Sequence, residues 1–206
     1  NGQLVVGAQP VSSFKTIIGS SKPITVPVQL TNAHIHWLAA PVLQDVYPLD
    51  FRVSGPLTLV YTPAVETVPW QVHGKVSLRL DDFQLDNQRL GLVKPLHRIL
   101  KIPQIKIDGE LQLDSRELRP SGLVLSLPKS KFKVGGKVDF KNGFDLQATG
   151  VVDLQDVGEL AGNEVRGQGT LSTHIHGPSA RVFVDFDADL QNAYYLRLKL
   201  GSLKGR

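Results

Sequence analysis

The residues best suited to chemistry are two His-x-His pairs, His34/His36 and His174/His176. Residues i and i+2 of a β-strand share one face, so each pair has the spacing needed to chelate a metal such as zinc. Both pairs fall on the polar side of an alternating segment, with no cysteine nearby and no carboxylate that the sequence alone places beside them. We therefore predict solvated histidines and no metal site.

A second candidate is the row Asp185, Asp187 and Asp189, which would also share one strand face. Neighbours in such a row lie about 6.5 to 7 Å apart, which overlaps the carboxylate separation of glycosidases. A general acid needs a raised pKa, but the hairpin expected here sets basic residues opposite two of these aspartates, which lowers it. The sequence also lacks a Gly-rich phosphate loop, a Gly-x-Ser-x-Gly elbow and a His-Glu-x-x-His motif. We predict a charge-paired outer surface, no enzyme activity and no cofactor.

Amino-acid composition further limits the classes of protein to which this chain can belong. The 206 residues are 41% hydrophobic and 20% charged, which is typical of a folded protein. The net charge of +4 is carried by Lys and Arg scattered among Asp and Glu, so we expect no nucleic-acid partner. Cysteine is absent, which excludes disulfides and thiolate metal sites. Methionine is absent too, and we expect a processed piece of a larger parent chain that forms one elongated β domain over residues 1–206.

Period-two alternation dominates the chain. Apolar residues occupy every second position in the segments 49–61, 72–80, 105–113, 144–154 and 165–175. Strands that are apolar on one side and polar on the other belong to antiparallel sheets with one solvated face. A change of parity at Asp81-Asp82 indicates a β-bulge.

Two hairpins can be placed in register. A three-residue loop at 141–143, with Gly143 in the left-handed position, would pair Phe140 with Phe144 and Val138 with Leu146. Near the C-terminus, a turn centred on Asn192 gives both faces a consistent pairing. The expected partners are Ala188 with Leu196, Phe186 with Leu198, Val184 with Leu200, Asp187 with Arg197 and Asp185 with Lys199.

Only residues 94–101 favour a helix, with Pro95 in its first turn and Leu96, Ile99 and Leu100 at helical spacing. Two turns of helix cannot cover so much apolar strand surface. That surface must therefore be covered by the sheet itself, by another chain or by a ligand.

Glycine recurs in mid-strand on the apolar side, which marks bends or a close approach of backbone. The positions are Gly55, Gly74, Gly109, Gly136 and Gly150. The sequence thus predicts an all-β fold, a long curved antiparallel sheet with an apolar concave face and one short helix. A β-sandwich is the alternative.

Several short motifs carry a family resemblance. They are the segment 130–140 (SKFKVGGKVDF), followed by 144–150, 152–154, 165–171, 175–178 and 200–205, with 48–55 in the same style. From about Leu49 onward, the chain resembles the TamB and AsmA-like family, bacterial relatives of bridge-like lipid-transfer proteins that include the TamB subunit of the translocation and assembly module. The resemblance implies a β half-pipe, or β-taco, without catalytic residues. The short helix at 94–101 departs from that plain strand repeat.

The resemblance also implies a cellular role. The parent protein would be anchored in the inner membrane of a Gram-negative bacterium, cross the periplasm and partner an outer-membrane barrel of the TamA or BamA type. This segment would continue a groove formed with adjoining segments of the same parent chain, and would carry phospholipid between the membranes in outer-membrane biogenesis. The alternative is a scaffold for assembly or secretion of outer-membrane and autotransporter proteins by β-augmentation.

The period-two alternation and the family resemblance both predict an apolar groove suited to phospholipid acyl chains. We predict that it is lined by Phe51, Val53, Leu57, Val76, Leu78, Ile107, Leu111, Val134, Val138, Phe140, Phe144, Leu146, Val152, Leu171, Ile175, Val184, Phe186, Leu196 and Leu198.

Overall fold

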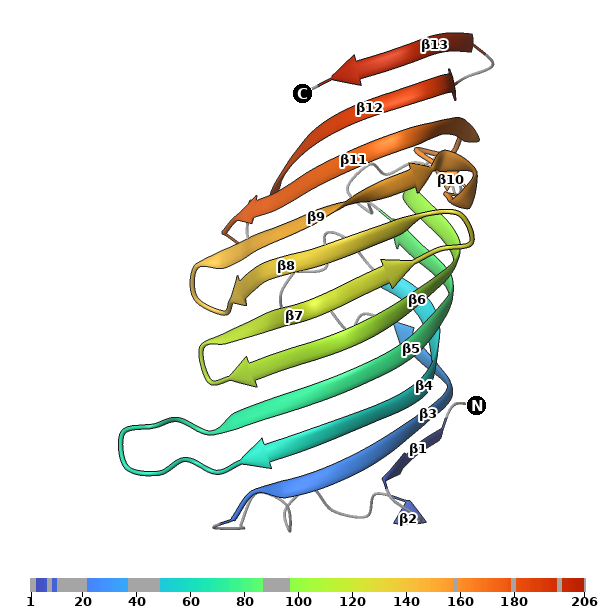
Figure 1. Cartoon of the computed structure of the whole chain (residues 1–206). Coiled ribbons are helices and arrows are strands. Elements are labelled where there is room, and N and C mark those ends of the chain that lie inside the picture. Colours follow the sequence, from blue (N-terminus) through green and yellow to red (C-terminus); the bar gives the residue numbers. More distant parts are fainter. Residues whose placement is uncertain are drawn as a thin grey trace.

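The computed structural model describes residues 3–6, 9–10, 22–36, 49–86, 97–157, 159–178, 181–195 and 198–205. These residues form one curved antiparallel sheet (Figure 1). Its strands are β1 Gln3–Val6, β2 Gln9–Pro10, β3 Ile24–His36, β4 Leu49–Thr62, β5 Gln71–Asp86, β6 Arg98–Asp114, β7 Glu117–Ser126, β8 Lys131–Asp139, β9 Gly143–Asp153, β10 Glu159–Leu160, β11 Val165–Gly177, β12 Phe183–Tyr195 and β13 Leu198–Gly205. The described residues also include a 3₁₀ turn, η2 Leu154–Asp156, directly after β9.

The sheet is a meander in which most strands pair with their sequence neighbours. The order is β13-β12-β11-β9-β8-β7-β6-β5-β4-β3-β1-β2, and β10 pairs with β6 off this path. All thirteen of the described strands belong to this one sheet, so the β-sandwich alternative is wrong.

The helix expected over 94–101 is wrong where the structure describes it. Strand β6 begins at Arg98, and Leu100 pairs with Leu85 of β5 on one side and with Leu160 of β10 on the other. An apolar pattern of two turns is too short to favour a helix once both neighbouring strands offer backbone partners. Residues 94–96 lie outside the described residues.

The β8–β9 hairpin forms with a register that differs from the predicted one by two residues. Val138 pairs with Phe144, and Phe140 lies in the turn rather than opposite Phe144. The Asp139 carboxylate accepts hydrogen bonds from the backbone N–H groups of Lys141 (2.9 Å) and Asn142 (2.8 Å). This side-chain turn explains the register, because it places the loop one residue earlier than the predicted Gly143-containing loop.

The turn predicted at Asn192 is also wrong. Strand β12 runs through Asn192 to Tyr195, and Tyr195 then pairs with Leu198 of β13. Asn192 has a φ of 53°, at a shift of register between Leu190 and Ala193. Asparagine tolerates this left-handed conformation in bulges as well as in turns, so its presence did not distinguish the two. The bulge predicted at Asp81-Asp82 is confirmed, since Asp82 has a φ of 55° where the β4–β5 register shifts.

The core lies on the apolar side of the long strands. Val53 of β4, Leu80 of β5 and Ile105 of β6 are buried together, and half-buried apolar residues of β3 and β7 pack around them. Side chains converge on the concave face of a bent sheet, so residues on that face bury one another. The buried apolar cluster therefore lies on the inner face of the curved sheet, as predicted.

Mid-strand glycines mark the bends, as the sequence suggested. Gly136 has a φ of 102°, and a β-carbon at this position would lie 2.1 Å from the backbone oxygen of Asp145 on β9. Gly55 has a φ of 134°, and its β-carbon would lie 2.2 Å from the oxygen of Ser77 on β5. Only glycine fits such close inter-strand contacts, and residues of this kind let a sheet curl tightly.

Candidate functional site: the apolar face of the sheet

The inner face is apolar without a break from one strand to the next. Cross-strand pairing in β-sheets joins residues whose side chains lie on the same face. Starting in β5, one row of paired residues crosses the sheet to β13 through Leu78, Ile107, Leu125, Phe132, Gly150, Leu171, Ala188 and Gly205. At a strand spacing of about 4.8 Å, the seven steps of this row span about 34 Å.

The register places most of the predicted lining residues on this face, which we call the apolar face. Pairing with apolar partners or glycine puts most of them there, as with Val138 opposite Phe144 and Leu146 opposite Ile175. Phe186, which is opposite Thr173, is placed there by its alternation with Val184 and Ala188. The residues so placed are Phe51, Val53, Leu57, Val76, Leu78, Ile107, Leu111, Val134, Val138, Phe144, Leu146, Val152, Leu171, Ile175, Val184, Phe186 and Leu198.

Two predicted lining residues are not part of it. Phe140 lies in the β8–β9 turn, where it is 52% exposed, because the Asp139 turn moves it out of the strand. Leu196 lies outside the described residues.

The structure adds residues that the prediction left out. Leu30 and Ile35 of β3, Phe83 of β5 and Ile102 of β6 pack against the buried cluster, and the rings of Phe51 and Phe83 lie 5.8 Å apart. The alternation of Val26, Val28 and Leu30 was a usable signal for β3.

Burial is uneven along the face, and buried residues occur in β9, β11 and β12 (Val152, Val165 and Ala193) as well as in β4 to β6. Val53 is 4% exposed, whereas Phe186 of β12 is 57% exposed and Leu198 of β13 is 62% exposed. Apolar area at the β12–β13 end is therefore still open to a ligand, while the β4–β6 end already has a packed core.

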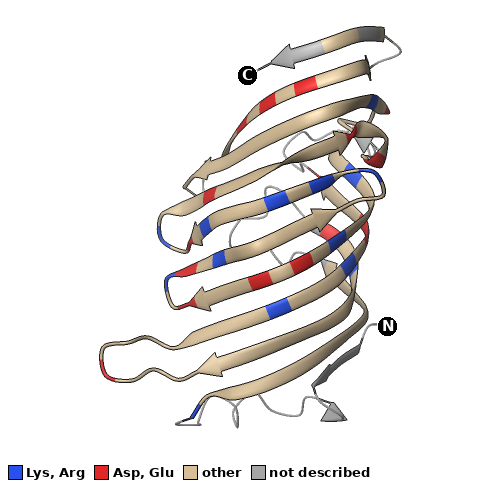
Figure 2. Cartoon of the chain, viewed as in Figure 1, with Lys and Arg blue, Asp and Glu red and all other residues tan. Residues whose placement is uncertain are grey.

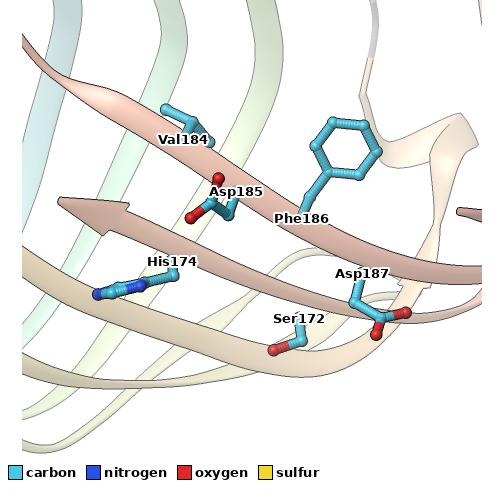
Figure 3. Close-up of a pocket in the computed structure, with 6 residues that line it drawn as sticks. All are labelled: Ser172, His174, Val184, Asp185, Phe186 and Asp187. Atoms are coloured by element: carbon cyan, nitrogen blue, oxygen red, sulfur yellow. The ribbon is translucent and has the colours of Figure 1, made fainter. Parts of the chain in front are cut away.

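A hollow of about 690 Å³ lies at β11 and β12 (Figure 3). Val184 and Phe186 project from one side of β12, whereas Asp185 and Asp187 lie on the other side, opposite His174 and Ser172 of β11. Because residues of both faces line it, this hollow belongs to an edge of the sheet and is not a closed apolar pocket.

Residues that alternate with those of the apolar face lie on the convex face, and they include charged pairs such as Lys75 opposite Glu110. Basic and acidic residues are interspersed along the strands (Figure 2). The aspartates 185, 187 and 189 do share this face, but their strand partners are His174, Ser172 and Lys204, not the predicted Arg197 and Lys199. The β12–β13 register accounts for the difference, because β12 runs on to Tyr195 and Lys199 lies opposite Tyr194.

The side chains of His34, His174 and His176 are solvent-accessible, and each also has a carboxylate partner that the sequence did not reveal. The Nε2 atom of His174 lies 2.9 Å from Asp145 Oδ1, and that of His176 lies 2.8 Å from Asp185 Oδ2. On β3, His34 Nε2 lies 2.6 Å from Asp50 Oδ1. The side chain of His36 lies outside the described residues.

Comparison with known proteins adds no relative. No family model, no curated protein and no solved structure matches this chain. Within the described residues, no helix has the length and apolar character needed to span a membrane. The functional argument therefore rests on the apolar face.

Proposed function

We propose that this chain binds phospholipid acyl chains on its apolar face and acts, without catalysis, as a segment of a conduit between the inner and outer membranes. The observation that carries the proposal is the unbroken apolar row from β5 to β13, on the inner side of a one-layer sheet. A single layer leaves that face without a protein partner of its own among the described strands. The periplasmic location and the TamA- or BamA-type barrel partner are proposed on the family resemblance.

The chemistry of the face suits acyl chains. Burying one CH₂ group contributes about 0.8 kcal/mol, so a chain of about 16 carbons would contribute on the order of 10 kcal/mol gross relative to water. A lipid that starts in a membrane gains much less. A conduit benefits from this weak net binding, because the lipid has to leave again.

Two measurements test the proposal. The purified chain is extracted and its co-purifying phospholipid identified by mass spectrometry. In cells, a photocrosslinking amino acid is placed at Leu146 or Phe186, both on the apolar face. We expect lipid adducts at both positions.

Val151 provides a matched control. It lies on β9 beside the apolar-face residue Val152, but it faces outward, opposite Thr170 and Lys131, and it is 54% exposed. Its exposed fraction is thus close to the 57% of Phe186, while its face differs. The proposal fails if no phospholipid co-purifies and the crosslinker at Phe186 labels lipid no more than the one at Val151.

A second candidate function rests on a free strand edge. Strand β12 pairs with β11 along residues 183–187, but β13 pairs with β12 only at Ala188 and beyond. Within the described strands, the other edge of 183–187 has no partner, so an extended segment of a client protein could add there by β-augmentation. Crosslinkers at Phe186 that label protein and no lipid would favour this scaffold function.

A further inference from the structure

A group of potential metal ligands lies on the convex face, where β9, β11 and β12 run side by side. His174 and His176 come from β11 and Asp185 comes from β12. One ligand atom of each lies within 4.8 Å of the ligand atoms of the other two. Asp145 of β9 adjoins the group, 2.9 Å from His174 Nε2.

The backbone explains why these residues meet. Alternation in β11 puts both histidines on the convex face, and the register sets His174 opposite Asp185 and His176 opposite Asp145. Each carboxylate contacts the histidine diagonally across from it, so all four side chains turn toward one another. Backbone hydrogen bonds between the three strands hold the Cα positions of these residues fixed relative to one another.

The rings are held in place from one side. The imidazoles of His174 and His176 stack with centroids 4.7 Å apart, and Phe183 stacks on His176 at 5.5 Å. The guanidinium of Arg181 lies 4.9 Å from the centroid of Phe183. This stack limits the rotation of His176, as an apolar shell does around metal-binding histidines. The other side is open, because the two histidine side chains are 39% and 36% exposed.

We infer that His174, His176 and Asp185 bind a divalent transition-metal ion such as zinc on the convex face of the sheet. Two imidazoles and one carboxylate are a ligand set that zinc takes readily. Tetrahedral zinc with bonds of about 2.0 to 2.1 Å needs ligand atoms about 3.3 Å apart. The 2.8 Å contact between His176 and Asp185 would open by about 0.5 Å, and the longest separation would close by at most about 1.5 Å, through side-chain rotation alone.

Asp145 is the nearest candidate for the fourth position. It already contacts His174, and its carboxylate is exposed enough to turn toward an ion. Its loss should weaken the site less than the loss of Asp185, which belongs to the three-residue group. The site faces away from the apolar face, so it neither requires lipid binding nor follows from it.

The test uses the whole chain without an affinity tag, stripped with a chelator and titrated with Zn²⁺ by calorimetry. We expect one ion per chain at this site, and a tetrahedral absorption spectrum when Co²⁺ replaces Zn²⁺. His174→Gln and His176→Gln should each weaken binding at least tenfold, Asp185→Asn should weaken it similarly, and Asp145→Asn less. The glutamine and asparagine variants keep side-chain size, and circular dichroism checks that the sheet is retained.

Two control variants locate the ion. His73→Gln changes an exposed histidine of β5 outside the group and should leave binding unchanged. His34→Gln changes the other His-x-His pair, where any binding would be a separate event. The inference is overturned if Zn²⁺ does not bind, if binding survives the double variant His174→Gln/His176→Gln, or if His34→Gln removes it.

Discussion

The bend at Gly136 offers a direct test of the curved sheet. Gly136→Ala adds one β-carbon at a φ of 102°, where it would lie 2.1 Å from the backbone oxygen of Asp145. Gly135, the preceding residue, is a matched control, because a β-carbon there meets nothing within 4 Å and its φ is not in the positive range. The two substitutions are chemically identical and adjacent, but they face opposite sides of β8.

The expected size of the effect follows from these two contacts. A non-glycine residue in this part of conformational space is strained by about 1 to 3 kcal/mol. Relieving the overlap with the neighbouring strand adds about 1 to 3 kcal/mol, as overpacking does. Gly136→Ala should therefore lower the free energy of unfolding by about 2 to 6 kcal/mol. Gly135→Ala should raise it by about 0.4 to 1 kcal/mol, because alanine restricts the unfolded chain.

Urea unfolding followed by circular dichroism measures both variants. With a slope of about 2 kcal/mol per molar urea, Gly136→Ala should lower the midpoint by about 1 to 3 M. The midpoint for Gly135→Ala should be equal to or above that of the unmodified chain. If the two variants unfold within about 0.5 kcal/mol of each other, the bend of β8 does not depend on Gly136, and the proposed origin of the curvature is wrong.

Three further predictions concern the apolar face, the β8–β9 turn and the η2 junction. Phe186→Ser should weaken phospholipid binding by about 10- to 150-fold, since burying a Phe side chain contributes about 1.5 to 3 kcal/mol. Val151→Ser on the convex face should leave co-purified lipid unchanged. Hydrogen bonds from the Asn142 and Lys141 N–H groups lower the pKa of Asp139. The contribution of Asp139 to stability is therefore present above the unfolded pKa of about 3.9 and is lost as the pH falls through the folded pKa. The urea midpoint should drop between pH 6 and pH 3, and it should drop less in Asp139→Asn. Ser130 is 3% exposed, donates to Asp156 Oδ2 at 2.6 Å and accepts from the Asp153 N–H at 2.8 Å. Ser130→Ala should lower the free energy of unfolding by about 1 to 3 kcal/mol in the same urea assay, because the buried Asp156 carboxylate and the half-buried Asp153 N–H each lose a hydrogen bond.

The apolar face could be predicted from the sequence because period-two alternation survives errors of register. The observed β8–β9 pairing differs from the predicted one by two residues, so Val138 and Phe144 keep their face although their partners change. Alternation could not reveal which of two nearby loops closes a hairpin. That choice depends on the Asp139 side chain and its hydrogen bonds to the turn.

Features that depend on two or more strands at once could not be predicted. The pairing of His174 and His176 with carboxylates requires the registers of β9, β11 and β12 together. The loss of the expected helix likewise depends on Leu85 and Leu160, which flank Leu100 from two different strands. A single segment carries no information about such partners, and its short apolar spacing then favours the wrong element.

The two faces of the sheet make the two proposals separable. Phe186 and Asp185 are adjacent on β12, yet one projects to the apolar face and the other to the convex face (Figure 3). Phe186→Ser should therefore reduce lipid binding and leave zinc binding intact, and Asp185→Asn should do the reverse. A variant that abolished both would indicate that β12 itself had detached from β11, because only the strand links the two side chains. Loss of one activity alone identifies the face that carries it.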